Sequence, residues 1–197
     1  MTERRLLLAT KNSGKVREIR RALRGVPLKI IELEDVLPGL SHRERGKTFS
    51  ENARAKSLYY SRKWDGLVLA EDSGLEIEAL EGAPGVRSAR FSGPKSSDEK
   101  NNRKVLHLLR KVPAAARKAR FVCVMVLAKE GRVVREFRGE VRGRIGLEPQ
   151  GASGFGYDPL FYYPPLRRTF AELPPEVKNA VSHRGRAVLK LRAFLEA

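Results

Sequence analysis

The chain has 197 residues, 41% hydrophobic and 32% charged, which is typical of a globular protein with a substantial core, and we expect residues 1–197 to form a single domain. Its 40 Lys and Arg residues outnumber 23 Asp and Glu residues, so the net charge of +17 favours anionic partners. No apolar run reaches the ~18 residues of a membrane span, and one cysteine, Cys123, rules out an internal disulfide, so we expect a cytoplasmic protein without a membrane partner.

The basic residues are scattered along the chain and mixed with acidic ones, and they form no uninterrupted basic tail. A dedicated nucleic-acid-binding module would gather its cations on one face. The distribution therefore favours a polyanionic small molecule over a specific nucleic-acid partner. We expect any DNA binding to be weak, nonspecific and lost by about 0.2 M salt.

A strand over residues 4–10 and a helix over residues 15–24 are predicted by the apolar pattern near the beginning of the chain. The turn that joins them reads Thr10-Lys-Asn-Ser-Gly-Lys15. Backbone N–H groups at a helix N-terminus attract anions, and Lys15 adds a full positive charge. The segment therefore predicts phosphate binding, although it lacks the Walker spacing and many similar junctions bind nothing.

A second strand is predicted over residues 28–31, and a polar loop follows it. Thr48 and Glu51 have the spacing of a capping box, which predicts a helix from there to about residue 63. Helical spacing places Lys56 on one stripe with the expected core-facing residues Phe49, Asn52, Ala53 and Tyr60. A lysine in that position either extends its charged end to solvent or points at a buried phosphate.

Leu67–Ala70 is a run of apolar residues that predicts a strand buried on both faces, ending in a turn at Ser73-Gly74. Between them lie Glu71 and Asp72, and neighbouring residues of a strand point to opposite faces. Ligands of open α/β sheets lie at the carboxyl ends of strands, so one of these carboxylates is a candidate site residue. An acidic turn without function is the alternative.

The second half of the chain predicts a helix and a hairpin. Ser96 and Glu99 have the spacing of another capping box, and the helix that they open ends before Pro113. Residues 119–128 and 132–144 predict the two arms of a β-hairpin with its turn at Glu130-Gly131.

Gly151–Pro159 is a glycine-rich loop that carries Phe155, Tyr157 and Asp158. Glycines beside aromatic residues would let the backbone approach a flat ring stacked on an aromatic face. A flexible loop with buried aromatic side chains is the alternative. The glycines do not fit a Rossmann fingerprint.

The last helix is predicted to follow Ser182 as its N-cap. His183 and Arg184 then occupy its first turn, where cations oppose the helix dipole. Residues placed against a local preference are often there for a ligand, and a solvated helix start is the alternative.

With these segments in order, the sequence closely resembles the inosine triphosphate pyrophosphatase family, the XTP/dITP diphosphatases. The matching segments are Leu8–Lys15, Thr48–Ala53, Ala70–Leu75, Gly82–Arg90, Gly154–Phe161 and Ser182–Gly185. They span nearly the whole chain in the family's order.

The resemblance implies a magnesium-dependent hydrolase that acts on the α–β phosphoanhydride. Its substrates would be deaminated purine nucleoside triphosphates (ITP, dITP and XTP), and its products the monophosphate and pyrophosphate. It also implies a homodimer and an α/β fold, elongated and two-lobed, with a central mixed β-sheet, flanking helices and a cleft between the lobes.

The family's functional residues transfer by position. The triphosphate would be held by Thr10, Lys11, Asn12, Ser13, Gly14 and Lys15, with Lys56 assisting catalysis. The nucleotide would be held by Ser73, Phe155, Gly156, Tyr157, Asp158, Lys178, His183 and Arg184. Magnesium would be held by Glu44 and Asp72, with Glu32, Glu34 and Asp35 competing for the place of Glu44. Asp72 would accept the proton or only orient the water, and Glu71 stands where the family more commonly has aspartate.

Two other functions compete with this interpretation. A basic nucleic-acid-binding protein would use the positive charge, and a phosphatase or kinase-like transferase would use the same phosphate site. For the pyrophosphatase, we expect donors near His183 and Arg184 to satisfy the C6 oxygen of hypoxanthine or xanthine and to oppose the amino group of adenine.

Overall fold

The computed structural model describes residues 4–197 and contains a seven-stranded sheet in the order β2-β1-β3-β4-β5-β6-β7. The strands are β1 (Arg5–Leu8), β2 (Lys29–Glu32), β3 (Leu67–Ile77), β4 (Lys118–Lys129), β5 (Arg132–Ile145), β6 (Phe161–Tyr163) and β7 (Arg168–Thr169). The helices are α1 (Ser13–Ala22), α2 (Leu33–Val36), α3 (Phe49–Ser61), α4 (Asp98–Leu108), α5 (Pro175–Val181) and α6 (His183–Glu196). Short 3-10 helices are η1 (Glu78–Leu80), η2 (Gly85–Arg90), η3 (Ala114–Ala116), η4 (Pro164–Leu166) and η5 (Phe170–Glu172).

The sheet is mixed. Strand β1 pairs in parallel with β2 and β3, whereas β6 pairs antiparallel with β5 and β7. The predicted α/β class, with helices flanking a central mixed sheet, is therefore confirmed. The elongated outline and the cleft that the resemblance implies stay predictions. None of the helices in the described part of the chain is long and apolar enough to cross a lipid bilayer.

The chain divides into two compact units. Unit 1 comprises the residues up to Asp72 together with Cys123–Gly139 and Arg184–Ala197, and unit 2 comprises Ser73–Val122 and Glu140–His183. The long strands β3, β4 and β5 contribute residues to both units. That the whole chain acts as one domain stays a prediction.

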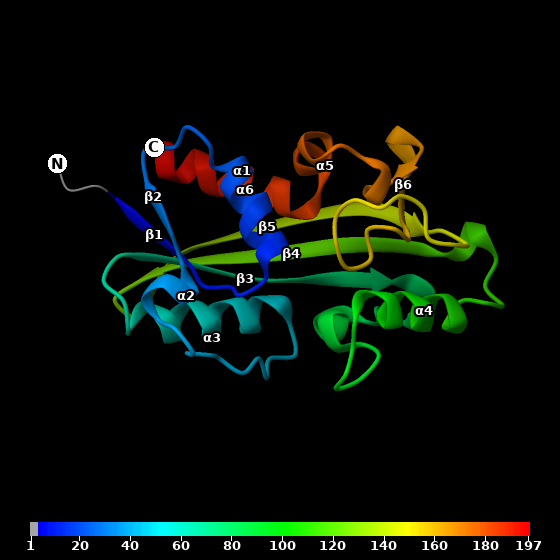
Figure 1. The fold of residues 1–197 in the computed structure, drawn as a ribbon, viewed down its shortest axis with the longest axis horizontal. Coiled ribbons are helices and arrows are strands. Elements are labelled where there is room, and N and C mark those ends of the chain that lie inside the picture. The colour runs from blue at the N-terminus through cyan, green and yellow to red at the C-terminus, as the bar shows by residue number, and fades with distance from the viewer. Residues whose placement is uncertain (1–3) are drawn as a thin grey trace. The chain divides into compact units, whose positions relative to one another are not determined.

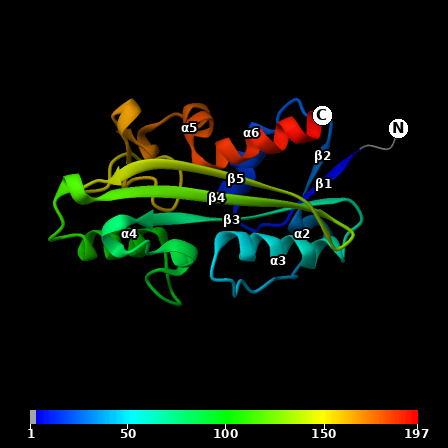
Figure 2. The same cartoon turned by 180° about the vertical axis from the view of Figure 1, so that it is seen from behind.

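In unit 1, helices cover both faces of the strands (Figures 1 and 2). Helices α1 and α6 lie on one face, where Leu6 and Leu8 of β1 join their core cluster. Helices α2 and α3 lie on the other, where Leu7 joins a second cluster with Tyr60. The alternation along β1 follows from the two-residue period of a strand and explains why its apolar run is unbroken.

Unit 2 has a core of its own, rich in aromatic residues. Phe121, Phe161 and Phe170 pack together, with ring centroids of Phe121 and Phe161 4.6 Å apart and those of Phe161 and Phe170 4.8 Å apart. Val105 and Leu109, at the end of α4, complete the cluster and are fully buried.

The β-hairpin predicted from the alternating pattern is confirmed as β4 and β5. Glu130 and Gly131, the predicted turn residues, have φ of 50° and 72°. Two successive left-handed residues are the signature of the tight hairpin turn that matches the twist of a sheet, and glycine adopts this conformation readily.

Several sequence predictions of element bounds are wrong. Helix α1 spans Ser13–Ala22 rather than residues 15–24. Strand β3 does not end in a turn at Ser73-Gly74 but continues to Ile77, so Asp72 lies within the strand. Helix α4 begins one residue later than predicted, because Ser97 rather than Ser96 accepts the hydrogen bond from the N–H of Lys100. In each case the sequence indicated a strand or a helix correctly but placed its end at the wrong residue.

The capping box at Thr48 is only half formed. Its hydroxyl accepts from the N–H of Glu51 at 3.1 Å, but the Glu51 carboxylate accepts from the N–H of Lys47 at 2.7 Å. The predicted helix is confirmed as α3, and its predicted inward stripe, which includes Lys56, is buried. The short helices α2 and α5 were not predicted.

Candidate active site

The predicted phosphate-binding turn is built at the N-terminus of α1. Asn12 is the N-cap, and its side-chain oxygen accepts from the N–H of Lys15 at 2.9 Å. The hydroxyl of Thr10 accepts from the N–H of Asn12 at 3.2 Å, which fixes the turn before the helix. Lys11 pairs with Glu34 over 2.6 Å, and both side chains are about half exposed. The first turn of α1 contains no acidic residue, so its positive dipole end is suited to an anion.

Lys15 is the cation of this turn, and it reaches the interior of unit 1. Its Nζ lies 2.8 Å from Oε1 of Glu71 on β3. Glu71 is 2% exposed and also accepts from Arg184 of α6, whose Nε lies 2.8 Å from Oε2 and whose Nη2 lies 3.1 Å from Oε1. Arg184 Nη1 donates to Glu18 of α1, and the Cys123 thiol lies 3.3 Å from Glu71 Oε2.

These contacts fix the ionisation of the buried groups. Burial opposes the charged form of Glu71, but Arg184 and Lys15 outweigh it and hold its pKa well below the usual value. Burial likewise opposes the charge of Lys15, yet Glu71 raises the pKa of that ammonium above its usual value. Both groups are therefore charged at neutral pH, and the carboxylate is saturated by cations.

Asp72, the next residue of β3, has different neighbours, as expected from the alternation of a strand. Asn52 of α3 donates from Nδ2 to Oδ2 of Asp72 at 2.8 Å, while its own oxygen accepts from the N–H of Gly46. Burial first, and then the charge of Glu44, raise the pKa of Asp72. Adjacent carboxylates with pKa values displaced in opposite directions suit different roles, and Asp72 is the one suited to accept a proton.

Lys56 and Glu44 form an ion pair beside this group. Lys56 comes from the inward stripe of α3 and Glu44 from the loop before it, and their side chains are 11% and 25% exposed. The lysine therefore does not extend to open solvent, and its buried charge is balanced by the residue that the resemblance assigns to the metal.

The residues present fit a magnesium ion of the kind that relies on its substrate. Within residues 4–197, no group of three or more His, Cys, Asp or Glu side chains is arranged to hold a metal. Magnesium is commonly held by one or two carboxylates, with phosphate oxygens and water completing its shell. The negative charge of Glu44 raises the pKa of Asp72, and a divalent cation held by both carboxylates would relieve that repulsion.

Unit 2 brings the glycine-rich loop and Lys178 together. Asp158 accepts from the N–H of Phe155 at 2.9 Å and from the ammonium of Lys178, which lies 4.9 Å from the centroid of the Phe155 ring. Gly154 has φ of 82°, and a Cβ there would lie 2.1 Å from Asp158 Oδ2. Glycine is thus required at that position by both conformation and space.

Two further loop residues are anchored to α4 and η2. The N–H of Gly156 donates to Asp98 at 2.6 Å, and its carbonyl accepts from Asn102 at 3.0 Å. The hydroxyl of Tyr157 donates to the carbonyl of Ser88 at 2.8 Å, and its ring belongs to the core of unit 2. Burial raises the pKa of this phenol above its usual range. Of the two loop aromatics, Phe155 is half-buried and Tyr157 buried.

His183 and Ser73 complete the predicted set. The ring of His183 stacks on Phe121, with centroids 4.6 Å apart and planes inclined by 12°. Ser73 is half-buried in β3. The structure thus gathers the predicted residues within each unit, namely Thr10–Lys15, Glu44, Lys56, Asp72 and Arg184 in unit 1, and Ser73, Phe155–Asp158, Lys178 and His183 in unit 2. Their roles toward a ligand stay predictions.

Several residues of these groups were not assigned from the sequence. Glu18, Glu71 and Asn52 support the unit 1 residues through buried contacts. Two of them could have been found from the sequence. Glu18 in α1 and Asn52 in α3 are polar residues that fall at helical spacing on an apolar stripe. Asp98 and Asn102 left no such signal for a contact with the glycine-rich loop.

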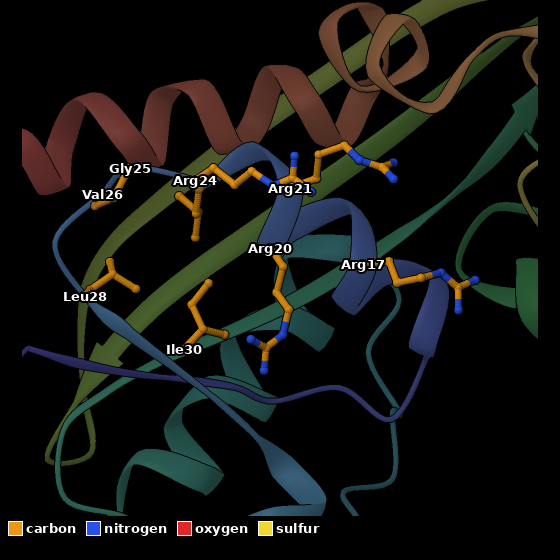
Figure 3. Close-up of a pocket in the computed structure, with 9 residues that line it drawn as sticks. Arg17, Arg20, Arg21, Arg24, Gly25, Val26, Leu28 and Ile30 are labelled. Carbon is orange, nitrogen blue, oxygen red and sulfur yellow. The ribbon is translucent and has the colours of Figure 1, made fainter.

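A separate pocket of about 550 Å³ lies beside α1 in unit 1 (Figure 3). Its cationic residues, at helical spacing on one stripe, are Arg17, Arg20, Arg21 and Arg24. Arg20 donates to Glu32 at 2.9 and 3.1 Å. Within residues 4–197, the guanidinium groups of Arg17 and Arg24 have no hydrogen bond or ion pair. The remaining lining residues are Leu23, Gly25, Val26, Leu28 and Ile30.

The fold and these groups define an α/β protein with a helix N-terminus suited to anions, next to a buried carboxylate pair. The Ham1 family model matches residues 6–194, and the chain belongs to this family. A curated relative from Geobacter sulfurreducens, named dITP/XTP pyrophosphatase, is 48% identical, covering 97% of this chain and 96% of the relative.

Solved structures of Ham1 proteins resemble the fold of this chain. A HAM1 protein from Coxiella burnetii has a TM-score of 0.89 and 40% identity, with 98% of this chain and all of that chain covered. The Staphylococcus aureus Ham1 protein has a TM-score of 0.87 and 38% identity, with 98% of each chain covered. The family resemblance predicted from the sequence is therefore confirmed.

Proposed function

We propose that this chain hydrolyses deaminated purine nucleoside triphosphates, namely ITP, dITP and XTP, to the monophosphate and pyrophosphate. The observation that carries the proposal is that Lys15, in the first turn of α1, pairs with Glu71, and that the next residue, Asp72, is a buried carboxylate with a raised pKa. The name of the relative from Geobacter sulfurreducens supports the choice of substrate.

In this proposal the residues of unit 1 act on the phosphates. The helix N-terminus and Lys15 offset the roughly four negative charges of a triphosphate, with Lys56 as a further cation. Water attacks the α-phosphorus, the bond from that phosphorus to the bridging oxygen breaks, and pyrophosphate leaves. Asp72 accepts the proton of the water or orients it, and Asn52 fixes the carboxylate.

Magnesium belongs to the proposal as well. Glu44 and Asp72 would hold it, and it would supply charge neutralisation at the phosphates. The residues of unit 2 would hold the nucleotide, with Phe155 offering a face for the purine and Lys178, Asp158 and His183 offering polar groups. We also propose a cytoplasmic homodimer in which the whole chain acts as one pyrophosphatase domain.

A product assay tests the proposal. Incubation with ITP and magnesium should yield inosine monophosphate and pyrophosphate in equal amounts, measured by anion-exchange chromatography without added inorganic pyrophosphatase. Orthophosphate as the first product would indicate a phosphatase instead. No turnover of any purine triphosphate would return the nucleic-acid-binding function to consideration.

A further inference from the structure

A series of buried charges links α1 to β3 and α6 in unit 1. Starting from α1, Lys15 pairs with Glu71, Glu71 with Arg184, and Arg184 returns to α1 at Glu18. The side chains of Glu71, Arg184 and Glu18 are 1%, 3% and 9% exposed, whereas that of Lys15 is 17% exposed. Lys15 is thus the member of the series nearest to solvent, and it stands in the first turn of α1.

Arg184 holds Glu71 in one orientation. Its planar guanidinium meets both carboxylate oxygens, a geometry that an arginine fork imposes and a lysine cannot reproduce. Oε1, the oxygen that Lys15 contacts, is therefore fixed in place. Glu71 is the one ion-pair partner of Lys15 within residues 4–197, and an ammonium carries three donors, so donors remain for a ligand.

We propose that Glu71 and Arg184 are positioning residues that hold the Lys15 ammonium at the N-terminus of α1, where it receives the phosphates of the substrate. The proposal rests on the pyrophosphatase function proposed above and adds two roles to it. Arg184 acts on the phosphates through Glu71 and Lys15, instead of reading the purine base as the sequence led us to expect. What this role requires at position 71 is a negative charge, not a contact with substrate.

Charge counting and positioning make opposite predictions for the carboxylates. Glu71→Gln and Glu18→Gln each remove a negative charge from the neighbourhood of an anion site, and charge counting alone predicts tighter anion binding. Positioning predicts weaker binding, because the ammonium is no longer held beside the helix N-terminus. Whether anion affinity rises or falls in these variants therefore distinguishes charge counting from positioning.

The experiment is a calorimetric titration with inorganic tripolyphosphate in EDTA, which removes both the base and the metal from the measurement. We expect the unmodified protein to bind it, and Glu71→Gln to bind about tenfold more weakly, the effect of one charge-assisted hydrogen bond. Glu71→Asp keeps the charge and should stay within about threefold of the unmodified protein. Unchanged or tighter binding by Glu71→Gln would overturn the proposal.

A matched control separates positioning from loss of a buried charge. Arg117 in unit 2 is also buried and donates to the carbonyl oxygens of Leu109, Val112 and Gly146. Arg117→Gln should lower stability without changing tripolyphosphate affinity. If Glu71→Gln does not fold, Glu18→Gln carries the test, because it removes one of the two carboxylates that hold Arg184 and leaves the Glu71 side chain in place. Weaker binding supports the proposal, and equal or tighter binding contradicts it.

Arg184→Lys separates positioning from base recognition. Positioning predicts weaker tripolyphosphate binding and a raised KM for both ITP and ATP, with their ratio of kcat/KM within about twofold of the unmodified value. Intact tripolyphosphate affinity with a fallen ITP-to-ATP ratio would mean that Arg184 reads the base, and would overturn the proposal. Release of pyrophosphate from ITP by the unmodified protein tests the proposed function independently of both results.

Discussion

Asn52 donates a hydrogen bond from Nδ2 to Oδ2 of Asp72 over 2.8 Å, and both side chains are buried. A carboxylate that is buried, fixed by an amide and raised in pKa has the properties of a positioned proton acceptor. We predict that Asp72→Asn lowers kcat for ITP by at least about 10²-fold, the usual scale for a lost acid–base group.

The variant should stay folded, because asparagine has the shape of aspartate and removes a charge that burial penalises. Stability is checked by urea unfolding, and activity by pyrophosphate release. Asp65→Asn is the control, because its side chain is 87% exposed and should have no effect on either. Full activity of a folded Asp72→Asn variant would remove Asp72 from the mechanism.

The metal prediction concerns Glu44. EDTA should abolish hydrolysis and magnesium should restore it, and Glu44→Gln should raise the magnesium concentration for half-maximal activity by at least about tenfold. Direct calorimetric titration of magnesium into the protein gives a readout independent of turnover. Glu34→Gln is the matched control, because Glu34 competes for the role in sequence but pairs with Lys11 at a half-exposed position. A larger effect of Glu34→Gln would transfer the ligand role to that residue.

Cys123 should be unreactive in the folded protein. Its thiol is fully buried against Glu71, and burial first, and then that carboxylate, raise its pKa well above the usual value. Iodoacetamide at pH 8 should label it at least about a hundredfold more slowly than in urea, as measured by mass spectrometry, because labelling requires opening of the core.

The same thiol gives a stability prediction with a definite sign. Its pKa is higher in the folded than in the unfolded chain, so its contribution to stability is present below pH about 8.5 and is lost as pH rises above that value. Unfolding of the unmodified protein at pH 7 and pH 10 should therefore show a greater loss than unfolding of Cys123→Ala. An identical loss in the two proteins would show that the thiol does not contribute.

The arginine-lined pocket on α1 is where we expect nonspecific polyanion binding to concentrate. Arg17→Gln combined with Arg24→Gln should weaken binding to a DNA oligonucleotide in a fluorescence-anisotropy titration at low salt. The control pair, Arg103→Gln with Arg132→Gln, removes the same charge from exposed positions elsewhere and should have a smaller effect. Binding by the unmodified protein should vanish by about 0.2 M salt. Salt-resistant or sequence-selective binding would contradict the small-molecule interpretation.

Local patterns in the sequence predicted those features that depend on near neighbours. The inward stripe of α3, the β4–β5 hairpin and the helix after the Thr10–Lys15 turn follow from periodicity and turn chemistry, and the structure confirms them. The end of β3 was mispredicted because serine and glycine, at positions 73 and 74, commonly form turns. The strand instead continues through both residues. Tertiary pairing overrode the local preference there.

The buried charges of unit 1 could not be predicted in the same way. Arg184 is 113 residues from Glu71 and 166 from Glu18, so no local pattern joins them. The sequence placed Arg184 correctly in the first turn of the last helix and indicated that something compensates its unfavourable position. It could not indicate that the compensation includes two carboxylates of the protein itself.

The last prediction concerns substrate choice. Hypoxanthine and xanthine present an oxygen at C6, which accepts hydrogen bonds, whereas adenine presents an amino group, which donates them. A site that offers a donor there leaves buried groups unpaired when ATP binds, and each such group costs roughly 1–3 kcal/mol. Guanine shares the C6 oxygen and must be refused at C2, where a donor or a lack of space would exclude its amino group.

We therefore expect kcat/KM for ITP and XTP to exceed that for ATP and GTP by about 10²–10³-fold, the factor that one or two such contacts supply. The kcat/KM for dITP should be close to that for ITP, and this comparison is the control that the enzyme does not recognise the 2′-hydroxyl of the ribose. Initial rates of pyrophosphate release across the five nucleotides measure the order, and ATP or GTP turnover equal to that of ITP would show that the base is not distinguished at C6 or C2.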